Sequence, residues 1–198
     1  MLSTRSHNVS GRMDMTRRRR LAVIVAGVAV LAIVAGYFAV RVIPRTQSMH
    51  VSWAVRYQSL ADLKASTNVA VAGRFTGVLS QGFAPTTGIP YTEFSFAVDK
   101  VLYDPLARVP ALGGTLRVHQ TGSVSGNLTT EMDDDPLFSV GQTAVLFLRE
   151  YAPGYFAVVG GPQGRFGVSP SGQVSPFNSE TVPFVGTEDA LSSSLNLG

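Results

Sequence analysis

The residues most able to do chemistry gather in one short loop, which holds the carboxylates Glu131, Asp133, Asp134 and Asp135. A calcium ion takes about six to eight oxygen ligands, and clustered acids can supply some of them. Consecutive aspartates cannot all point at one ion, however, and no D-x-[DN]-x-[DN]-G spacing follows. We interpret the segment as a solvated loop in which Asp135-Pro136 turns the chain. A calcium-dependent structural module stays open as an alternative.

A second group combines His119 with Ser123 and Ser125, which invites a Ser-His-Asp interpretation. The nucleophile elbow G-x-S-x-G needs serine at its centre, whereas this segment has Val124 there. The chain has no cysteine and only three histidines, which are far apart in sequence, so a zinc site is not expected. We predict no catalytic residue, no metal and no cofactor, and hence no enzyme. A cell-surface hydrolase with an unrecognised site is the alternative.

Two further features resemble binding sites but have plainer explanations. Residues 160–164 are glycine-rich, but they join two predicted strands and precede no helix that could present amides to a phosphate. The aromatic residues Trp53, Tyr57, Phe83 and Tyr91 could line a ligand-binding face, although packing in the core or at its rim explains each one. The sequence therefore predicts no specific binding residue.

Charge is distributed unevenly along the chain. Residues 1–20 hold six arginines against one aspartate, a net charge of +5, and we expect this stub to be cytoplasmic and disordered. Residues 41–198 hold ten basic and twelve acidic side chains, a net charge of −2. The basic character therefore belongs to the stub, and a nucleic-acid partner is not expected.

Residues 21–40 form an uncharged apolar run that predicts a transmembrane helix. A helix of that length is about 30 Å long, close to the thickness of the bilayer's hydrocarbon core. The arginines directly before the run predict a cytoplasmic N-terminus. We therefore expect a single-pass protein of the cell membrane, with the lipid bilayer as one partner. Residues 41–50 would be a linker to an extracytoplasmic domain.

Residues 51–175 show the pattern of an all-β domain. A capping-box sequence at Ser59 and Asp62 predicts a short helix, and the continuous apolar run 144–148 is typical of a strand buried on both faces. Residues 121–139 lack periodicity and predict a loop. The tail 176–198 is expected to be partly disordered, with a short helix beginning near Thr187. Alternating or apolar patterns predict strands at 51–57, 69–79, 91–103, 115–120, 144–148, 155–159 and 165–168.

These elements predict a small OB-like barrel, or a sandwich, of about five to seven strands, preceded by one N-terminal transmembrane helix. The segments Leu60–Leu63, Asn68–Gly73, Phe94–Tyr103 and Gly141–Leu148 resemble a pattern in uncharacterised bacterial exported domains. Those domains are similar to the OB-like barrel of the tissue inhibitors of metalloproteinases. The resemblance covers about residues 60–168 and implies the fold alone, because the cysteines of the inhibitor family are absent. We expect a binding or interaction domain with an unidentified protein or cell-envelope partner.

Overall fold

A computed structural model describes residues 28–29, 32–37, 43–50, 53–109 and 113–196. The chain divides into two compact units, Met1–Pro44 and Arg45–Gly198. In the first unit, residues 28–29 and 32–37 are helical. The predicted stub 1–20 and most of the predicted transmembrane segment 21–40 lie outside the described residues. Among the residues that are described, no helix has both the length and the apolar character needed to cross a membrane.

The second unit is mostly β, which confirms the all-β prediction. The α-helices among its described residues are α2 (Leu60–Ala65) and α3 (Glu188–Asn196), and a 3₁₀ turn η1 covers Gly161–Gly164. Its strands are β1 (Arg45–Met49), β2 (Val69–Phe83), β3 (Pro90–Tyr103), β4 (Thr115–Thr121), β5 (Ser123–Ser125), β6 (Leu128–Met132), β7 (Thr143–Ala152), β8 (Tyr155–Val158), β9 (Arg165–Val168), β10 (Gln173–Pro176) and β11 (Gly186–Thr187).

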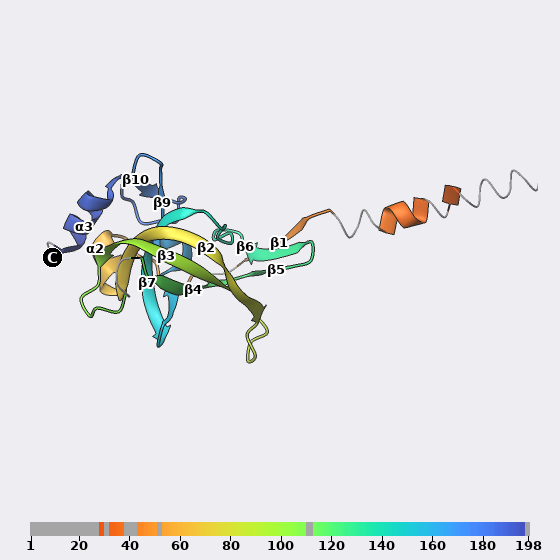
Figure 1. Ribbon diagram of the computed structural model, residues 1–198, viewed down its shortest axis with the longest axis horizontal. Coiled ribbons are helices and arrows are strands. Elements are labelled where there is room, and N and C mark those ends of the chain that lie inside the picture. Colours follow the sequence, from red (N-terminus) through yellow and green to blue (C-terminus); the bar gives the residue numbers. More distant parts are fainter. Residues whose placement is uncertain (1–27, 30–31, 38–42, 51–52, 110–112, 197–198) are drawn as a thin grey trace, which may run out of the picture. The chain divides into compact units, whose positions relative to one another are not determined.

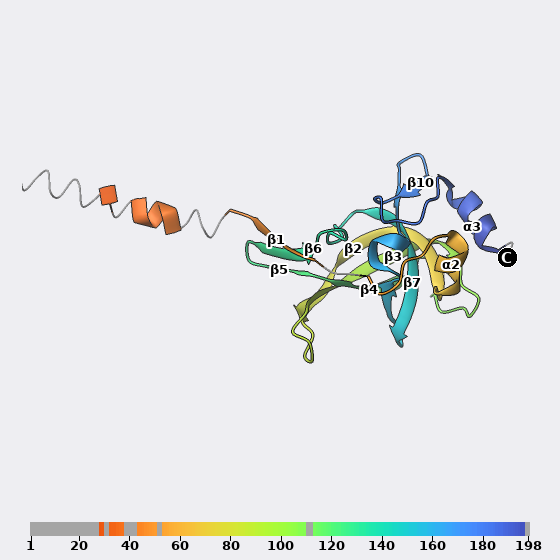
Figure 2. The ribbon, with the colours of Figure 1, turned by 180° about the vertical axis from the view of Figure 1, so that it is seen from behind.

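The strand pairings close part of the main sheet into a ring. The antiparallel pairs β7–β2, β2–β3 and β3–β4 are followed by the parallel pair β4–β8, and β8 pairs with β7 in an antiparallel hairpin that closes the ring. Strands β9, β10 and β11 continue the sheet beyond β7. Figures 1 and 2 show β2 and β3 as long, curved strands at the centre of this arrangement. A separate three-stranded sheet has the order β1–β6–β5.

Strand β7 explains why this domain has two apolar clusters. Ala144, Leu146 and Leu148 face the inside of the ring, where they pack with Phe75, Phe96 and other core residues. Val145 and Phe147 face the opposite side and pack with α2, α3 and β9. Both faces of the strand are therefore buried, as its continuous apolar sequence predicted.

Strand β2 bends where its glycines and bulges lie. A Cβ atom on Gly73 would lie 2.1 Å from the backbone oxygen of Ala97, so only glycine allows this close approach to β3. The pairing with β3 shifts register between Phe75 and Gly77 and again between Val78 and Ser80. These bulges interrupt the regular alternation of inward and outward side chains along the strand. Simple alternation from Val71 and Phe75 would place Leu79 on the inward face, but Leu79 is 50% exposed because the register shifts end this alternation.

Three other sequence-based expectations differ from the structure. The described residues of the predicted strand 51–57, from Trp53 onward, form no strand, and the predicted linker 41–50 contains β1. The predicted loop 121–139 contains β5 and β6, whose polar sequences pair with each other and with β1 in an exposed sheet. Only Ser123 and Met132 are buried among the residues of these three strands, so the sheet leaves no apolar alternation in the sequence.

Both short helices begin where the sequence predicts. The Ser59 hydroxyl accepts a hydrogen bond from the Asp62 amide at 3.1 Å, which caps α2. The Thr187 hydroxyl accepts one from the Ala190 amide at 3.2 Å, at the start of α3. Within the tail 176–198, α3 buries Leu191 and Leu195 against the second apolar cluster. The described part of the tail thus belongs to the folded domain.

Candidate functional site

The four carboxylates of the acidic loop, residues 131–135, turn to different partners. These partners are the Leu137 amide for Glu131, the His50 ring for Asp133, the Trp53 indole for Asp134 and the Arg165 guanidinium for Asp135. Among the residues that the structure describes, no group of three or more His, Asp or Glu side chains could hold a metal ion. The acidic loop therefore uses its charges to hold other parts of the chain.

The contact between Asp135 and Arg165 is a buried ion pair. The two side chains are 6% and 2% exposed, and Arg165 Nη1 lies 3.0 Å from Asp135 Oδ1. The guanidinium lies between the rings of Phe138 and Phe177, at 4.3 and 3.8 Å from their centroids. Burial raises the pKa of the Asp135 carboxyl, and the adjacent Arg165 charge opposes this shift. Burial likewise lowers the pKa of Arg165, opposed by Asp135.

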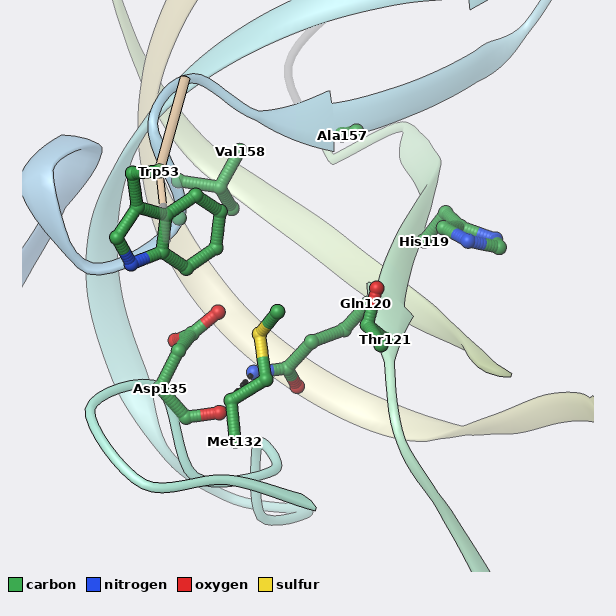
Figure 3. Close-up of a pocket in the computed structure, with 9 residues that line it drawn as sticks. Trp53, His119, Gln120, Thr121, Met132, Asp135, Ala157 and Val158 are labelled. Atoms are coloured by element: carbon green, nitrogen blue, oxygen red, sulfur yellow. Dashed lines mark hydrogen bonds between the residues drawn. The ribbon is translucent and has the colours of Figure 1, made fainter. Parts of the chain in front are cut away.

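A small cavity lies beside this ion pair. Its volume is about 140 Å³, and Figure 3 shows Trp53, Gln120, Met132, Asp135 and Val158 around it. The Gln120 amide already bonds the chain, because its nitrogen donates to the Pro136 carbonyl at 3.0 Å and its oxygen accepts from the Phe138 amide at 2.9 Å. Ligand pockets typically have about 300–1,000 Å³. The cavity is thus smaller than a typical ligand site, and much of its polar lining is occupied by contacts within the chain.

The outer surface of the ring carries a more promising group. Six side chains from four strands lie there, and we call them the aromatic face: Tyr91, Glu93, Arg117, His119, Tyr151 and Tyr155. Sheet register explains their proximity, because Glu93 pairs with His119 across β3–β4, and Arg117 pairs with Tyr155 across β4–β8. In β4, Arg117 and His119 alternate with the inward-facing Leu116 and Val118. The His119 ring in Figure 3 points away from the cavity, on the other side of β4 from Gln120.

The rings of the aromatic face contact one another in a row. His119 stacks on Tyr91, with centroids 5.2 Å apart and planes 23° apart, and meets Tyr151 edge-on at 5.7 Å. Tyr151 lies 6.1 Å from Tyr155, and the Arg117 guanidinium lies 4.6 Å from the centre of the Tyr155 ring. Tyr151 is the member in the middle of this chain of contacts, and it is 54% exposed.

One acidic group underlies the aromatic face. Glu93 is only 8% exposed, and its carboxylate accepts a hydrogen bond from the Ser80 hydroxyl at 2.7 Å and one from Arg117 Nη1 at 3.3 Å. The same Arg117 nitrogen donates to the Tyr155 hydroxyl at 3.0 Å. Glu93 lies on the outer side of β3, where Arg117 and Ser80 both bond its carboxylate. The carboxylate therefore holds Arg117 in place on the surface.

The surroundings of His119 favour the uncharged form of its imidazole. Burial lowers the pKa of the His119 imidazole, and the negative charge of Glu93 opposes this shift. Its Nδ1 atom is buried and has no hydrogen-bond partner within the part of the chain that the structure describes. Burial also raises the pKa of the Tyr151 hydroxyl, and Glu93 adds to the effect. At neutral pH the face therefore presents uncharged rings beside one Arg–Glu pair.

The structure separates most residues that the sequence offered as candidates. Trp53 and Tyr57 pack over η1, where a Cβ on Gly161 would lie 2.1 Å from the Trp53 ring, and Phe83 is 66% exposed at the end of β2. Of the four aromatic candidates, only Tyr91 belongs to the aromatic face. His119 contacts tyrosine rings, whereas Ser123 is buried on β5.

Sequence reasoning missed Arg117, Tyr151 and Tyr155 as members of a common surface. The alternation in 115–120 places Arg117 and His119 on one side of a strand, but it does not reveal which strands lie next to it. The chain matches no known protein-family model, and no curated protein matches it. Assignment of a function therefore depends on the residues of this chain and their geometry.

Proposed function

We propose that this protein is a non-enzymatic binding domain, anchored in the cell membrane by residues 21–40 and displayed outside the cytoplasm. The apolar run and the arginines of residues 17–20 directly before it support the anchor and its orientation. The domain would be an OB-like barrel. The closed ring of β2, β3, β4, β8 and β7, with its parallel β4–β8 pair, supports this assignment. The likeness to bacterial exported domains and to the metalloproteinase inhibitors remains a proposal about fold.

The ligand would bind to the aromatic face. The observation that carries this proposal is the unbroken row of contacts on the outside of the ring that runs from Tyr91 through His119 and two further tyrosines to Arg117. Exposed aromatic and arginine side chains are the residues most often responsible for binding energy at interfaces. OB-like barrels bind through the corresponding strands and loops. Because the Glu93 carboxylate is covered and engaged by two neighbours, we assign it to positioning Arg117 and not to acid–base chemistry.

The chemistry of the aromatic face favours a neutral ligand with many hydroxyl groups, such as a saccharide of the cell envelope. Ring faces pack against the apolar faces of a sugar, and the Arg117 guanidinium and tyrosine hydroxyls supply donors and acceptors for its hydroxyl groups. A nucleic acid fits less well, because residues 41–198 carry a net charge of −2 and binding to phosphates depends on cationic side chains.

Glycan binding by the full-length chain in lipid nanodiscs tests this function. A panel of neutral and charged envelope saccharides would be compared with single-stranded DNA. Truncating an interface hot spot costs about 2 kcal/mol or more, which corresponds to roughly a 30-fold rise in Kd. We expect that loss for Tyr151→Ala and Arg117→Ala with a neutral saccharide.

The matched control is Arg74→Ala, which removes an exposed arginine of β2 outside the aromatic face. It should bind like the unaltered chain, and thermal melts should show all three variants folded. Binding that survives both changes in the aromatic face would refute the site. Preference for DNA over every saccharide would refute the ligand class.

A further inference from the structure

The hairpin formed by β2 and β3 has an unusual composition. No charged residue occurs between Arg74 and Glu93, a stretch of eighteen residues that contains the whole hairpin tip. Four large apolar side chains in this stretch are exposed: Val78 at 48%, Leu79 at 50%, Phe83 at 66% and Ile89 at 47%. Exposed apolar groups that lie close together mark interaction surfaces more often than isolated ones do.

The same hairpin extends beyond the rest of the sheet. Strand β2 pairs with β7 only as far as Arg74, and β3 pairs with β4 only from Tyr91 onward. Strand β4 thus accompanies β3 up to Tyr91, the partner of Gly82, so that only the last pair, Phe83 with Pro90, and the turn that joins them extend beyond β4. Figures 1 and 2 both show the tip projecting away from the other strands. The tip, residues 83–89, thus projects from the end of a three-stranded part of the sheet, beyond the reach of β7 and β4.

We propose that the tip of this hairpin, residues 83–89, inserts into the lipid–water interface of the membrane in which the chain is anchored. This inference rests on the proposed anchor. Only four residues, 41–44, separate the apolar run from β1, so the start of β1 lies within about 18 Å of the end of that run. A tip without charges can enter the interface without the cost of desolvating an ionised group. Phe83 is the type of side chain that aromatic belts place at that depth.

The absence of cysteine makes a direct test possible, because one introduced cysteine can carry one fluorophore. Thr86→Cys places an environment-sensitive dye at the exposed tip and leaves Phe83 and Ile89 unchanged. Ser171→Cys, in the exposed turn between β9 and β10, is the matched control. The full-length chain would be reconstituted into phosphatidylcholine–phosphatidylglycerol vesicles, with or without bromine on the acyl chains.

We expect a blue-shifted emission at position 86 that brominated lipid quenches, and neither effect at position 171. Replacing Phe83 and Ile89 together by serine should abolish both effects, with circular dichroism unchanged. The inference would be overturned if aqueous iodide quenched the dye at position 86 and brominated lipid did not. Shielding of the dye from both quenchers would also overturn it, because that result indicates contact between protein copies. Treatment of the vesicles with alkaline carbonate separates the two proposals. A chain that stays in the membrane while its tip remains in water refutes the hairpin contact alone. A chain that the carbonate extracts refutes the anchor as well.

Discussion

Replacing Arg165 by methionine should test what the buried ion pair contributes. Methionine keeps much of the volume between the Phe138 and Phe177 rings but removes the charge and the hydrogen bonds to Asp135 and Pro136. Asp135, which is 6% exposed in its side chain, then stays buried without a counter-charge. Removing one partner of such a pair costs about 3–5 kcal/mol. In a domain of this size, that loss lowers Tm by about 6–20 °C.

The loss of stability in Arg165→Met should depend on pH. Burial already holds the pKa of Asp135 above its ordinary 3.8, so the folded state binds a proton more tightly than the unfolded state does. The associated stability is present at pH values below 3.8 and disappears as pH rises through the folded-state pKa. Without Arg165, its charge and its hydrogen bond no longer oppose this shift, and the pKa of Asp135 rises further. Arg165→Met should therefore be less stable at about pH 7.5 than at about pH 5, relative to the unaltered chain.

Urea unfolding of the full-length chain in detergent at both pH values measures this effect. Asp135→Asn is the matched control, because it leaves the guanidinium unpaired, and arginine keeps its charge throughout this range. Its destabilisation should be nearly the same at both pH values. The double variant should lose the pH-dependent part of the Arg165→Met effect. An equal loss at both pH values in Arg165→Met would refute the reasoning, because it would assign the whole cost to packing and not to a buried carboxylate.

Three further outcomes follow from local geometry. Gly161→Ala should destabilise the domain by more than about 1 kcal/mol and shift the Trp53 fluorescence, because the added Cβ would lie 2.1 Å from the indole. The control is Gly126→Ala, which has a similar positive φ but open space around it. This variant should cost only about 1 kcal/mol in urea unfolding. Leu191→Ala should cost about 2–5 kcal/mol and expose α3 to limited proteolysis, because Leu191 is fully buried. Ser59→Ala should cost about 1 kcal/mol in the same unfolding assay, because it removes the cap of α2.

The buried strands could be predicted because their neighbours in sequence determine their burial. Strand β7 is apolar at five consecutive positions, and the structure places alternate members in two different clusters. Both helix starts were predictable for a similar reason, since a cap is a contact between residues three apart. The order of the strands around the ring required knowledge of pairing between distant segments, which no single strand encodes.

The candidate site was far less predictable. The aromatic face brings together residues from position 91 to position 155, and its members depend on the parallel pair β4–β8. Arg165 gave no signal either, because an arginine at the start of a predicted strand is normally exposed. Its burial depends on Phe138 and Phe177, which lie 27 residues before it and 12 residues after it. The bulges of β2 changed the face on which Leu79 lies, and their positions within the strand depend on its partner.

The acidic loop shows how a sequence that resembles a metal site can serve another purpose. Three consecutive aspartates bind three different partners: Asp133 contacts His50, Asp134 accepts a hydrogen bond from Trp53 at 2.6 Å, and Asp135 pairs with Arg165. The first two contacts attach the segment that follows β1, and β1 itself pairs with β6 directly before the loop. The N-terminal segment of the domain is therefore joined to the core through these acids. Consecutive side chains that diverge cannot surround one cation, but they can join segments that approach from different directions.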